Sequence, residues 1–175
     1  MTITSVEEHR REAPRSVSCA VITVSDTRTP ETDKSGRLIM ELLEAHGHKV
    51  AHYEIVKDEY ELLSEILAQA ADNPHAEVVL LNGGTGIAAR DTTYEAVRDR
   101  LCKEMPGFGE LFRYLSYAED IGSAAILSRA IAGTIGNATA VFSMPGSTGA
   151  VKLAMTRLIL PELGHVMREL YKDMV

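Results

Sequence analysis

The segment Val78–Asp91 constrains the fold of this chain more than any other part of it. It opens with an unbroken apolar run (VVLL), which is typical of a strand buried on both faces of a parallel sheet. Glycines follow at the point where that strand must end: Gly83, Gly84 and Gly86. Glycine accepts positive φ and lets other groups approach the backbone, so a turn around Thr85 can present N–H donors to an anion. With Asp91 able to hold a cation beside that anion, the segment predicts a phosphate site with a metal ion.

Hydrophobic patterning along the chain alternates between the periods of strands and helices. The expected strands are residues 19–24, 49–56, 78–82 and 138–143. The expected helices are residues 35–45, ended by Gly47, then 60–71, 93–101, 108–117, 124–132 and 150–171, the last interrupted near Pro161. This alternation predicts an α/β fold with a parallel or mostly parallel sheet covered by helices on both faces.

Composition limits the kind of protein that this chain can be. Residues 1–16 are polar and lack the apolar core of a secretory signal, so we expect a flexible arm or an oligomer contact before a single domain over 17–175. No apolar run approaches the ~18 residues that cross a bilayer, and the net charge of -7 argues against nucleic-acid binding. Cys19 and Cys102 show no metal-ligand spacing or disulfide framework, which fits a reducing cytoplasm.

Polar loops follow four of the expected strands. Ser25 and Asp26 follow the first, Asp58 the second, residues 83–91 the third and residues 144–147 the last. Ligands bind α/β sheets at the carboxyl ends of the strands. Carboxylates gathered there repel one another by roughly 4 kcal/mol per pair at ~4 Å and an effective dielectric of ~20. Mg²⁺, which binds carboxylates together with phosphate oxygens, would relieve that repulsion.

Several of these acidic residues also have a purely structural interpretation. Asp58 with Glu61 fits a helix-capping box, and capping and function are equally open for it. Asp33 is favoured as the cap of the helix that follows it. Asp26 could form only an Asx-turn.

Asp91 is the carboxylate with the strongest functional interpretation. Thr92 and Glu95 already form a T-x-x-E capping box, so Asp91 is not needed to cap the helix. The stretch 84–89 formally fits a dinucleotide-binding pattern, but it follows the third strand and has no acidic residue at a strand end about 20 residues later. No Gly-Lys-Ser/Thr sequence follows either, so a Walker loop is excluded.

Two further segments stay ambiguous. Residues 143–148 place hydroxyl side chains and a glycine at a helix start, which suits either an anion site or an ordinary turn with an N-cap. Residues 107–132, which contain Arg113, Ser128 and Arg129, lack a clear core stripe and could cover an active site or join subunits.

The motifs, in their order along the chain, resemble the MoaB/Mog family of molybdenum cofactor biosynthesis proteins. The resemblance extends from about Val17 to His165 and rests on these stretches: residues 23–26 (TVSD), 33–36 (DKSG), 82–86 (NGGTG), 90–93 (RDTT), 106–113 (PGFGELFR), 127–130 (LSRA) and 144–147 (MPGS). The versions at 107–110 and 145–147 are closest to the MoaB branch.

The resemblance implies a three-layer α/β/α sandwich with a mostly parallel mixed sheet, a molybdopterin-binding domain that forms a homotrimer or a dimer of trimers. Active relatives are adenylyltransferases (nucleotidyltransferases) that use magnesium and ATP to adenylylate molybdopterin, releasing pyrophosphate. Other members bind molybdopterin without catalysis, and related domains serve as scaffolds. The resemblance thus implies molybdopterin and a nucleotide as ligands, with contact to other molybdenum cofactor proteins also expected.

The resemblance also implies roles for particular residues. Asp58 and Asp91 would bind Mg²⁺ and orient the reacting phosphates, and an acid at 58 is typical of the active branch. The turn of Gly83, Gly84, Thr85 and Gly86 would give backbone donors. The remaining implied ligand-binding residues are Pro145, Gly146 and Ser147 for the pterin or its phosphate, and Ser25, Asp26, Asp33, Ser35 and Gly36 around the nucleotide.

Overall fold

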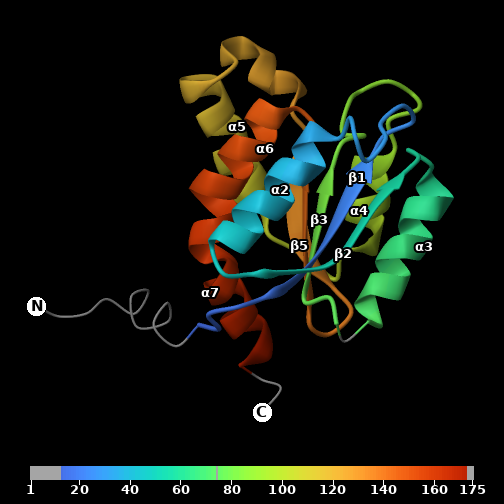
Figure 1. The fold of residues 1–175 in the computed structure, drawn as a ribbon. Coiled ribbons are helices and arrows are strands. Elements are labelled where there is room, and N and C mark those ends of the chain that lie inside the picture. The colour runs from blue at the N-terminus through green and yellow to red at the C-terminus, as the bar shows by residue number, and fades with distance from the viewer. Residues whose placement is uncertain (1–12, 74, 173–175) are drawn as a thin grey trace, which may run out of the picture.

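A computed structural model describes residues 13–73 and 75–172 of the chain. Its core is a six-stranded sheet with the strand order β2-β1-β3-β6-β5-β4 (Figure 1). Four neighbouring strands are parallel: β2 (Lys49–Val56), β1 (Ser18–Val24), β3 (Val78–Asn82) and β6 (Thr139–Met144). Each of these strands lies within one residue of its predicted bounds, and the mostly parallel sheet is confirmed.

The last two strands of the sheet correct the sequence prediction. The helix expected over 124–132 is wrong: a 3₁₀-helix, η1 (Gly122–Leu127), is followed by strand β5 (Ile131–Ile135), which runs antiparallel to β6. A short edge strand, β4 (Lys103–Glu104), pairs with β5. Gly136, at φ +54°, helps to turn the chain so that Ile135 faces Thr139. Hydrogen bonding between β5 and β6 in this hairpin therefore overrides the helical preference that the spacing of the preceding small residues indicates.

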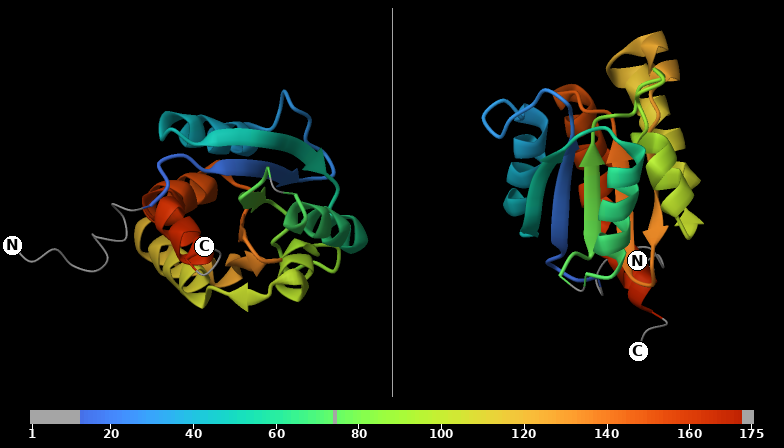
Figure 2. Two further views of the ribbon diagram at one scale, coloured as in Figure 1. Left: turned by 90° about the horizontal axis from the view of Figure 1, so that it is seen from below. Right: turned by 90° about the vertical axis from the view of Figure 1, so that its right-hand side faces the viewer.

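Helices cover both faces of the sheet and complete the expected three layers (Figure 2). Two of them, α3 (Tyr60–Ala71) and α4 (Thr93–Arg100), pack on one face through Leu63, Leu67 and Val97. The opposite face is covered by α2 (Lys34–Ala45), α5 (Pro106–Glu119), α6 (Thr148–Ala154) and α7 (Leu160–Tyr171). The predicted helices over 35–45, 60–71, 93–101 and 108–117 are confirmed with small shifts at their ends.

Strand β3 shows why the apolar run VVLL is needed at the centre of the sheet. Val78 and Leu80 face the α2 side, whereas Val79 and Leu81 face α3 and α4. All four side chains are fully buried. Burial of an aliphatic side chain stabilises a fold by about 1.5–3 kcal/mol, so this strand anchors both layers at the position from which the glycine turn leaves the sheet.

The C-terminal helical segment is interrupted where the sequence predicts. A π-helical turn, η2 (Met155–Ile159), joins α6 to α7, and the Leu160 N–H donates to the Met155 carbonyl. Pro161 has no N–H to donate to the residue four positions earlier, and its ring would clash in a regular α-helix. The wider turn places Leu163 and Met167 of α7 in the core.

The start of the described chain lies beside α7. Pro14 packs against Gly164, whose missing Cβ would lie 2.9 Å from the Pro14 carbonyl oxygen. Most of the expected N-terminal arm, residues 1–12, lies outside the described residues. Within the described residues, no helix is long and apolar enough to cross a bilayer.

Candidate active site

The glycine turn leaves β3 at the carboxyl edge of the sheet. Gly83 and Gly84 adopt φ values of +107° and +63°, which favour glycine. A Cβ on Gly83 would overlap the carbonyl oxygen of Val24 at the end of β1. A Cβ on Gly84 would overlap Asp58 Oδ2 and Thr93 Oγ1. A side chain at either position would collide with these neighbouring groups. The turn therefore needs glycine at both positions, as the sequence predicts.

Asp58 follows the end of β2, and its side chain reaches the start of α4. Its Oδ1 accepts hydrogen bonds from the Thr92 N–H at 3.0 Å, from Thr92 Oγ1 at 2.9 Å and from Thr93 Oγ1 at 3.2 Å. The capping interpretation of Asp58 is wrong, because Glu59 is the N-cap of α3 and makes no side-chain cap bond. The carboxylate instead ties the second and third strand-end loops together.

Asp91 lies on the other side of the same turn. Its Oδ2 accepts from the Ala88 N–H at 2.9 Å, and the carboxylate fills the space that a Cβ on Gly86 would need. The predicted Thr92–Glu95 capping box does not form, since Thr92 makes no side-chain cap bond and Glu95 pairs with Arg129. Asp58 and Asp91, distant in sequence, are thus brought to the two flanks of one glycine turn.

The two carboxylates suit a hard divalent cation. Within the described residues, Asp58 Oδ2 and Asp91 Oδ1 accept no hydrogen bond, so each carboxylate keeps one oxygen for a ligand. Across 13–73 and 75–172, no three His, Cys, Asp or Glu side chains gather as a metal-binding group. A cation here would need oxygens from phosphate and water, which is the usual way in which proteins bind Mg²⁺ with nucleotides.

A buried polar network supports the other half of this edge, on the α2 side. Asp33 is the N-cap of α2, as predicted, and accepts from the Gly36 N–H at 3.0 Å, from Thr23 Oγ1 at 2.6 Å and from Tyr53 Oη at 2.8 Å. Burial disfavours its charge, but these bonds outweigh that effect and lower the pKa of Asp33. A Cβ on Gly36 would overlap Asp33, so the glycine is required for this cap.

The network continues through Ser35 and Asn82 to Arg28. Ser35 Oγ donates to Asn82 Oδ1 at 2.7 Å, and Arg28 Nη1 donates to Ser35 Oγ at 2.5 Å. Arg28 Nη2 also donates to the carbonyl of Gly146 at 2.8 Å, which joins the loop after β1 to the loop after β6. Asp33 and Ser35 are fully buried, so they shape the edge from below.

The loop after β6 meets the glycine turn directly. A Cβ on Gly146 would lie 3.0 Å from the Cα of Gly83, so the two backbones are in contact. Ser147 is the N-cap of α6, where its Oγ accepts from the Ala150 N–H at 3.2 Å. Pro145 is half-buried beside them. The predicted cap is therefore present, and the exposed Ser147 stands at the rim of the site.

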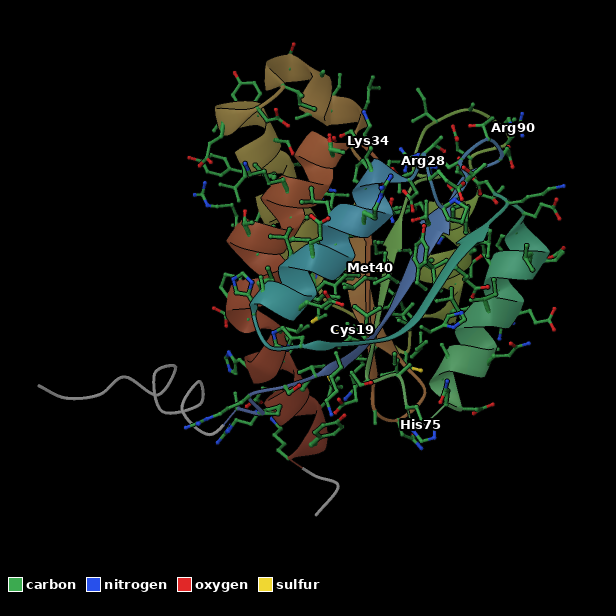
Figure 3. The ribbon with its side chains drawn as sticks, in the orientation of Figure 1. Cys19, Arg28, Lys34, Met40, His75 and Arg90 are labelled. Atoms are coloured by element: carbon green, nitrogen blue, oxygen red, sulfur yellow. The ribbon has the colours of Figure 1, made fainter. Side chains whose placement is uncertain are left out.

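Two residues after β1 complete the rim. Ser25 Oγ accepts from the Thr27 and Arg28 N–H groups at 3.3 and 3.1 Å. The side chain of Asp26 forms an ion pair with Arg90, so an Asx-turn is not its role. Arg28 and Arg90 both lie along the top of the sheet in Figure 3.

Arg129 is a residue whose contacts the sequence does not predict. Its guanidinium donates to the carbonyls of Thr85 and Gly86 and pairs with Glu95. It also lies 5.0 Å over the Tyr94 ring, and its hydrogen bonds lower the pKa of Glu95. The sequence places Arg129 in a segment that could cover an active site, and this is the one signal of its role. The partners of its guanidinium cannot be predicted, because they lie more than thirty residues away in the sequence.

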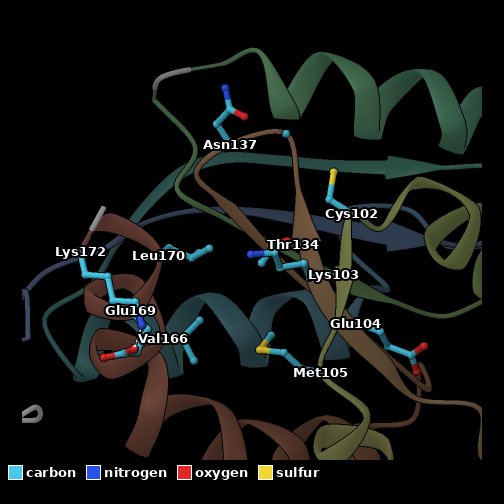
Figure 4. Close-up of a pocket in the computed structure, with 11 residues that line it drawn as sticks. Cys102, Lys103, Glu104, Met105, Thr134, Asn137, Val166, Glu169, Leu170 and Lys172 are labelled. Atoms are coloured by element: carbon cyan, nitrogen blue, oxygen red, sulfur yellow. Dashed lines mark hydrogen bonds and ion pairs between the residues drawn. The ribbon is translucent and has the colours of Figure 1, made fainter. Parts of the chain in front are cut away.

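One of the cavities near the sheet adjoins the candidate site. A cavity of about 470 Å³ borders Asp91 and Thr92 and extends to Tyr60. A larger one, of about 840 Å³, lies between the β4–β5 edge and α7 and contains none of the predicted site residues (Figure 4). Only the first can take part in chemistry at the glycine turn.

Similarity to known proteins agrees with this geometry. Residues 20–165 match the family model described as "Probable molybdopterin binding domain". Molybdenum cofactor biosynthesis protein B of Halalkalibacterium halodurans is 69% identical over 169 residues, covering 97% of this chain and 99% of that protein. The corresponding protein of Bacillus subtilis is 62% identical with the same coverage.

Solved structures give the same result. A crystal structure of molybdenum cofactor biosynthesis protein B superposes with a TM-score of 0.88 at 60% identity, covering 91% of this chain and 99% of that one. The tungsten cofactor synthesizing protein MoaB of Pyrococcus furiosus gives 0.79 at 40% identity, covering 90% and 98%. Fold and site therefore define a molybdopterin-binding α/β/α domain. Within that class, the chain belongs to the molybdenum cofactor biosynthesis protein B family and has a role in molybdenum cofactor biosynthesis.

Proposed function

We propose that this protein transfers AMP from Mg-ATP to the terminal phosphate of molybdopterin and releases pyrophosphate. The observation that carries the proposal is the pair Asp58 and Asp91, fixed on the two flanks of the turn around Thr85 with one oxygen of each left for a ligand. A purely structural carboxylate pair would not need to enclose a turn rich in backbone donors.

The reaction requires positioning more than a strong base. A phosphate oxygen of molybdopterin attacks the α-phosphorus of ATP and forms a new P–O bond. The bond from that phosphorus to the α–β bridging oxygen breaks, and pyrophosphate leaves with the electron pair. The backbone N–H groups from Gly84 to Gly86 would bind phosphate oxygens, while Asp58 and Asp91 would orient the reacting groups. Mg²⁺ held by the two carboxylates would neutralise developing negative charge.

The α2 side of the edge would receive molybdopterin. Gly146 and Ser147 border the turn there with Pro145 beside them, and the Arg28 guanidinium is half-buried against the Gly146 carbonyl. An arginine in that place favours a phosphate group. The residues expected around the nucleotide lie on this same side. Of these, Asp33, Ser35 and Gly36 are buried, so they would hold the edge in shape and not contact a ligand, whereas Ser25 and Asp26 stand at the rim.

The direct test uses Asp91→Asn. We expect this change to lower pyrophosphate release from Mg-ATP and molybdopterin by at least ~100-fold, because a charge contact in the transition state is lost. Asp72→Asn, exposed at the far end of α3, is the matched control and is expected to keep full activity. Full turnover by Asp91→Asn would contradict the assigned role.

A second candidate is a carrier that binds molybdopterin without adenylylating it. The three hydrogen bonds to Asp58 Oδ1 favour this candidate, because they would give that residue a structural purpose without catalysis. A carrier would bind molybdopterin but release no pyrophosphate when Mg-ATP is added, which separates it from the enzyme in the same assay.

Self-association is the third part of the proposal. A stripe on α5, formed by Leu111, Tyr114 and Tyr117, exposes 52%, 66% and 63% of each residue. Large apolar groups at helical spacing on a surface favour contact with another copy. A homotrimer or a dimer of trimers built through this stripe, working in the cytoplasm with other molybdenum cofactor biosynthesis proteins, is consistent with it.

A further inference from the structure

Arg129 binds the glycine turn through backbone carbonyl groups. Its Nε donates to the carbonyl of Thr85 at 3.0 Å. Its Nη2 donates to the carbonyl of Gly86 and, at 3.4 Å, to that of Asp91. A guanidinium is a rigid planar fork, so the carbonyls that bind it are held in one arrangement. The orientation of the peptide groups in the turn therefore depends on an arginine at least 38 residues later in the chain.

These carbonyl contacts determine where the N–H groups of the turn point. The described peptide bonds are all trans, and in a trans peptide the C=O of one residue and the N–H of the next point in opposite directions. Because the carbonyls of Thr85 and Gly86 point to Arg129, the N–H groups of Gly86 and Ile87 point away from it. Neither N–H group donates a hydrogen bond within the described residues. Two successive free donors of this kind form a site for an anion.

Glu95 holds the guanidinium of Arg129 in this position. Its Oε1 accepts a hydrogen bond from Nη1, and its Oε2 accepts from Nη2 at 3.3 Å, so the pair is bidentate. The Tyr94 ring supports the same guanidinium, with its centroid 5.0 Å away. Among the described residues, Nη1 of Arg129 has no other acceptor. Without Glu95 the guanidinium would lose its partner on the side away from the turn and could rotate toward water.

Glu95 also has a purely structural interpretation. It is the acidic residue in the first turn of α4, where a negative charge stabilises the helix dipole. That role concerns stability alone and needs no contact with Arg129. It does not account for a bidentate pair whose arginine also binds three carbonyls of the loop in front of the helix. Paired forks of this kind fix geometry as well as energy.

We propose that Glu95 is a positioning residue, which acts through Arg129 to orient the phosphate-binding N–H groups of the glycine turn. The inference rests on the proposed function, because that function places phosphates on this turn. Glu95 and Arg129 lie on the carbonyl side of the turn, whereas Gly86 and Ile87 present their N–H groups on the other side. The pair therefore acts on a phosphate through the backbone and not by touching it.

Calorimetric titration with Mg-tripolyphosphate tests this inference. We expect Glu95→Ala to raise the Kd about tenfold, since a hydrogen bond to a charged group is worth about that factor or more. Alanine keeps the helical backbone of α4. Removing a negative charge would by itself favour an anion, so weaker binding separates positioning from general electrostatics. Glu95→Gln keeps an acceptor oxygen and should bind at least about threefold more tightly than Glu95→Ala; it replaces Glu95→Ala if that variant does not fold.

Glu169→Ala is the matched control. It breaks an arginine–glutamate pair on α7, with Arg168, whose exposed fractions of 25% and 37% resemble the 24% and 35% of Arg129 and Glu95. Binding of Mg-tripolyphosphate by this variant should stay within about twofold of the wild type. In the ligand-free protein, the amide NMR signals of Gly86 and Ile87 should move in Glu95→Ala and stay in place in Glu169→Ala. Unmoved signals in Glu95→Ala would overturn the inference.

A double-mutant cycle tests whether Glu95 acts through Arg129. Arg129→Lys alone should also weaken Mg-tripolyphosphate binding about tenfold, because lysine cannot form the fork. The double variant should then bind about as weakly as the weaker single variant, since both changes remove one device. Independent effects would multiply to about a hundredfold loss. Such a loss, or normal binding by Glu95→Ala, would contradict the positioning role.

The outcomes also separate this inference from the proposed function. If the wild type releases pyrophosphate while Glu95→Ala binds Mg-tripolyphosphate normally, only the positioning role fails. If Glu95→Ala loses affinity but the wild type releases no pyrophosphate with molybdopterin and Mg-ATP, the positioning role stands and the proposed reaction fails. A wild type that binds no Mg-tripolyphosphate overturns the inference, and pyrophosphate release by that same protein would leave the reaction standing.

Discussion

Replacing Gly84 by alanine isolates how strongly the glycine turn depends on the carboxylate beside it. Gly84 has φ +63°, and a Cβ there would overlap both Asp58 Oδ2 and Thr93 Oγ1. Gly47 is a matched control within the same chain: it has φ +81°, and a Cβ there meets nothing within 4 Å. Gly47→Ala therefore introduces only backbone strain, whereas Gly84→Ala introduces strain and displaces a carboxylate.

The two effects have different sizes. The left-handed backbone costs alanine about 1 kcal/mol, which is the full expected loss for Gly47→Ala. Displacing Asp58 loses at least one of its hydrogen bonds from Thr92 and Thr93, each worth about 1.5–3 kcal/mol for a charged acceptor. Gly84→Ala should therefore destabilise by about 3 kcal/mol, with a fall in Tm of about 6–12 °C against 2–4 °C for the control.

The assay is urea unfolding at one fixed protein concentration, because an oligomer makes stability depend on concentration. Pyrophosphate release is measured on the same samples at a temperature where both variants are folded. Gly84→Ala should lose activity as well as stability, and Gly47→Ala should keep its activity. Equal losses of stability in the two variants would refute the view that Asp58 fills the space beside Gly84.

Three other predictions follow from the network, the guanidinium and the apolar stripe. Asp33→Ala should destabilise the protein by about 1–3 kcal/mol, because it removes the cap of α2 and leaves Thr23 and Tyr53 without their acceptor. Since the folded pKa of Asp33 is lowered, the part of this contribution that depends on its charge is present above the ordinary carboxyl pKa and is lost as the pH falls through the folded value, so unfolding midpoints measured against pH should show the difference between wild type and variant shrink in acid. Arg129→Lys cannot reproduce the fork to Thr85 and Gly86, so KM for ATP should rise about tenfold, and an unchanged KM would contradict its positioning role. Tyr117→Glu should shift the gel-filtration mass to that of a monomer, and an unchanged mass would place the interface elsewhere.

The parts of the fold that the sequence predicts correctly are those with local causes. The apolar run of β3, the cap at Asp33 and the interruption at Pro161 each follow from neighbouring residues. Strand β5 is missed because Ala132 and Gly133 at its centre interrupt the strand period, and only pairing with β6 makes this segment extended. Its turn residue Gly136 was the available signal.

The candidate site shows the same division. The glycine turn and the convergence of Asp58 with Asp91 can be predicted, because parallel strands bring their carboxyl ends to one edge. The bonds of Asp58 to Thr92 cannot be, since they join segments 34 residues apart and a local capping pattern competes with them. Arg28 and Arg129 contact residues that are far away in the sequence, so the spacing of residues along the chain does not predict these contacts.

The network from Asp33 through Ser35 and Asn82 to Arg28 has a consequence for recognition. Its torsions are fixed by hydrogen bonds before any substrate arrives. Association at that side therefore sacrifices little rotational freedom of the protein, so little of the binding free energy is lost to ordering side chains there. This flank of the edge is thus organised for its ligand in advance.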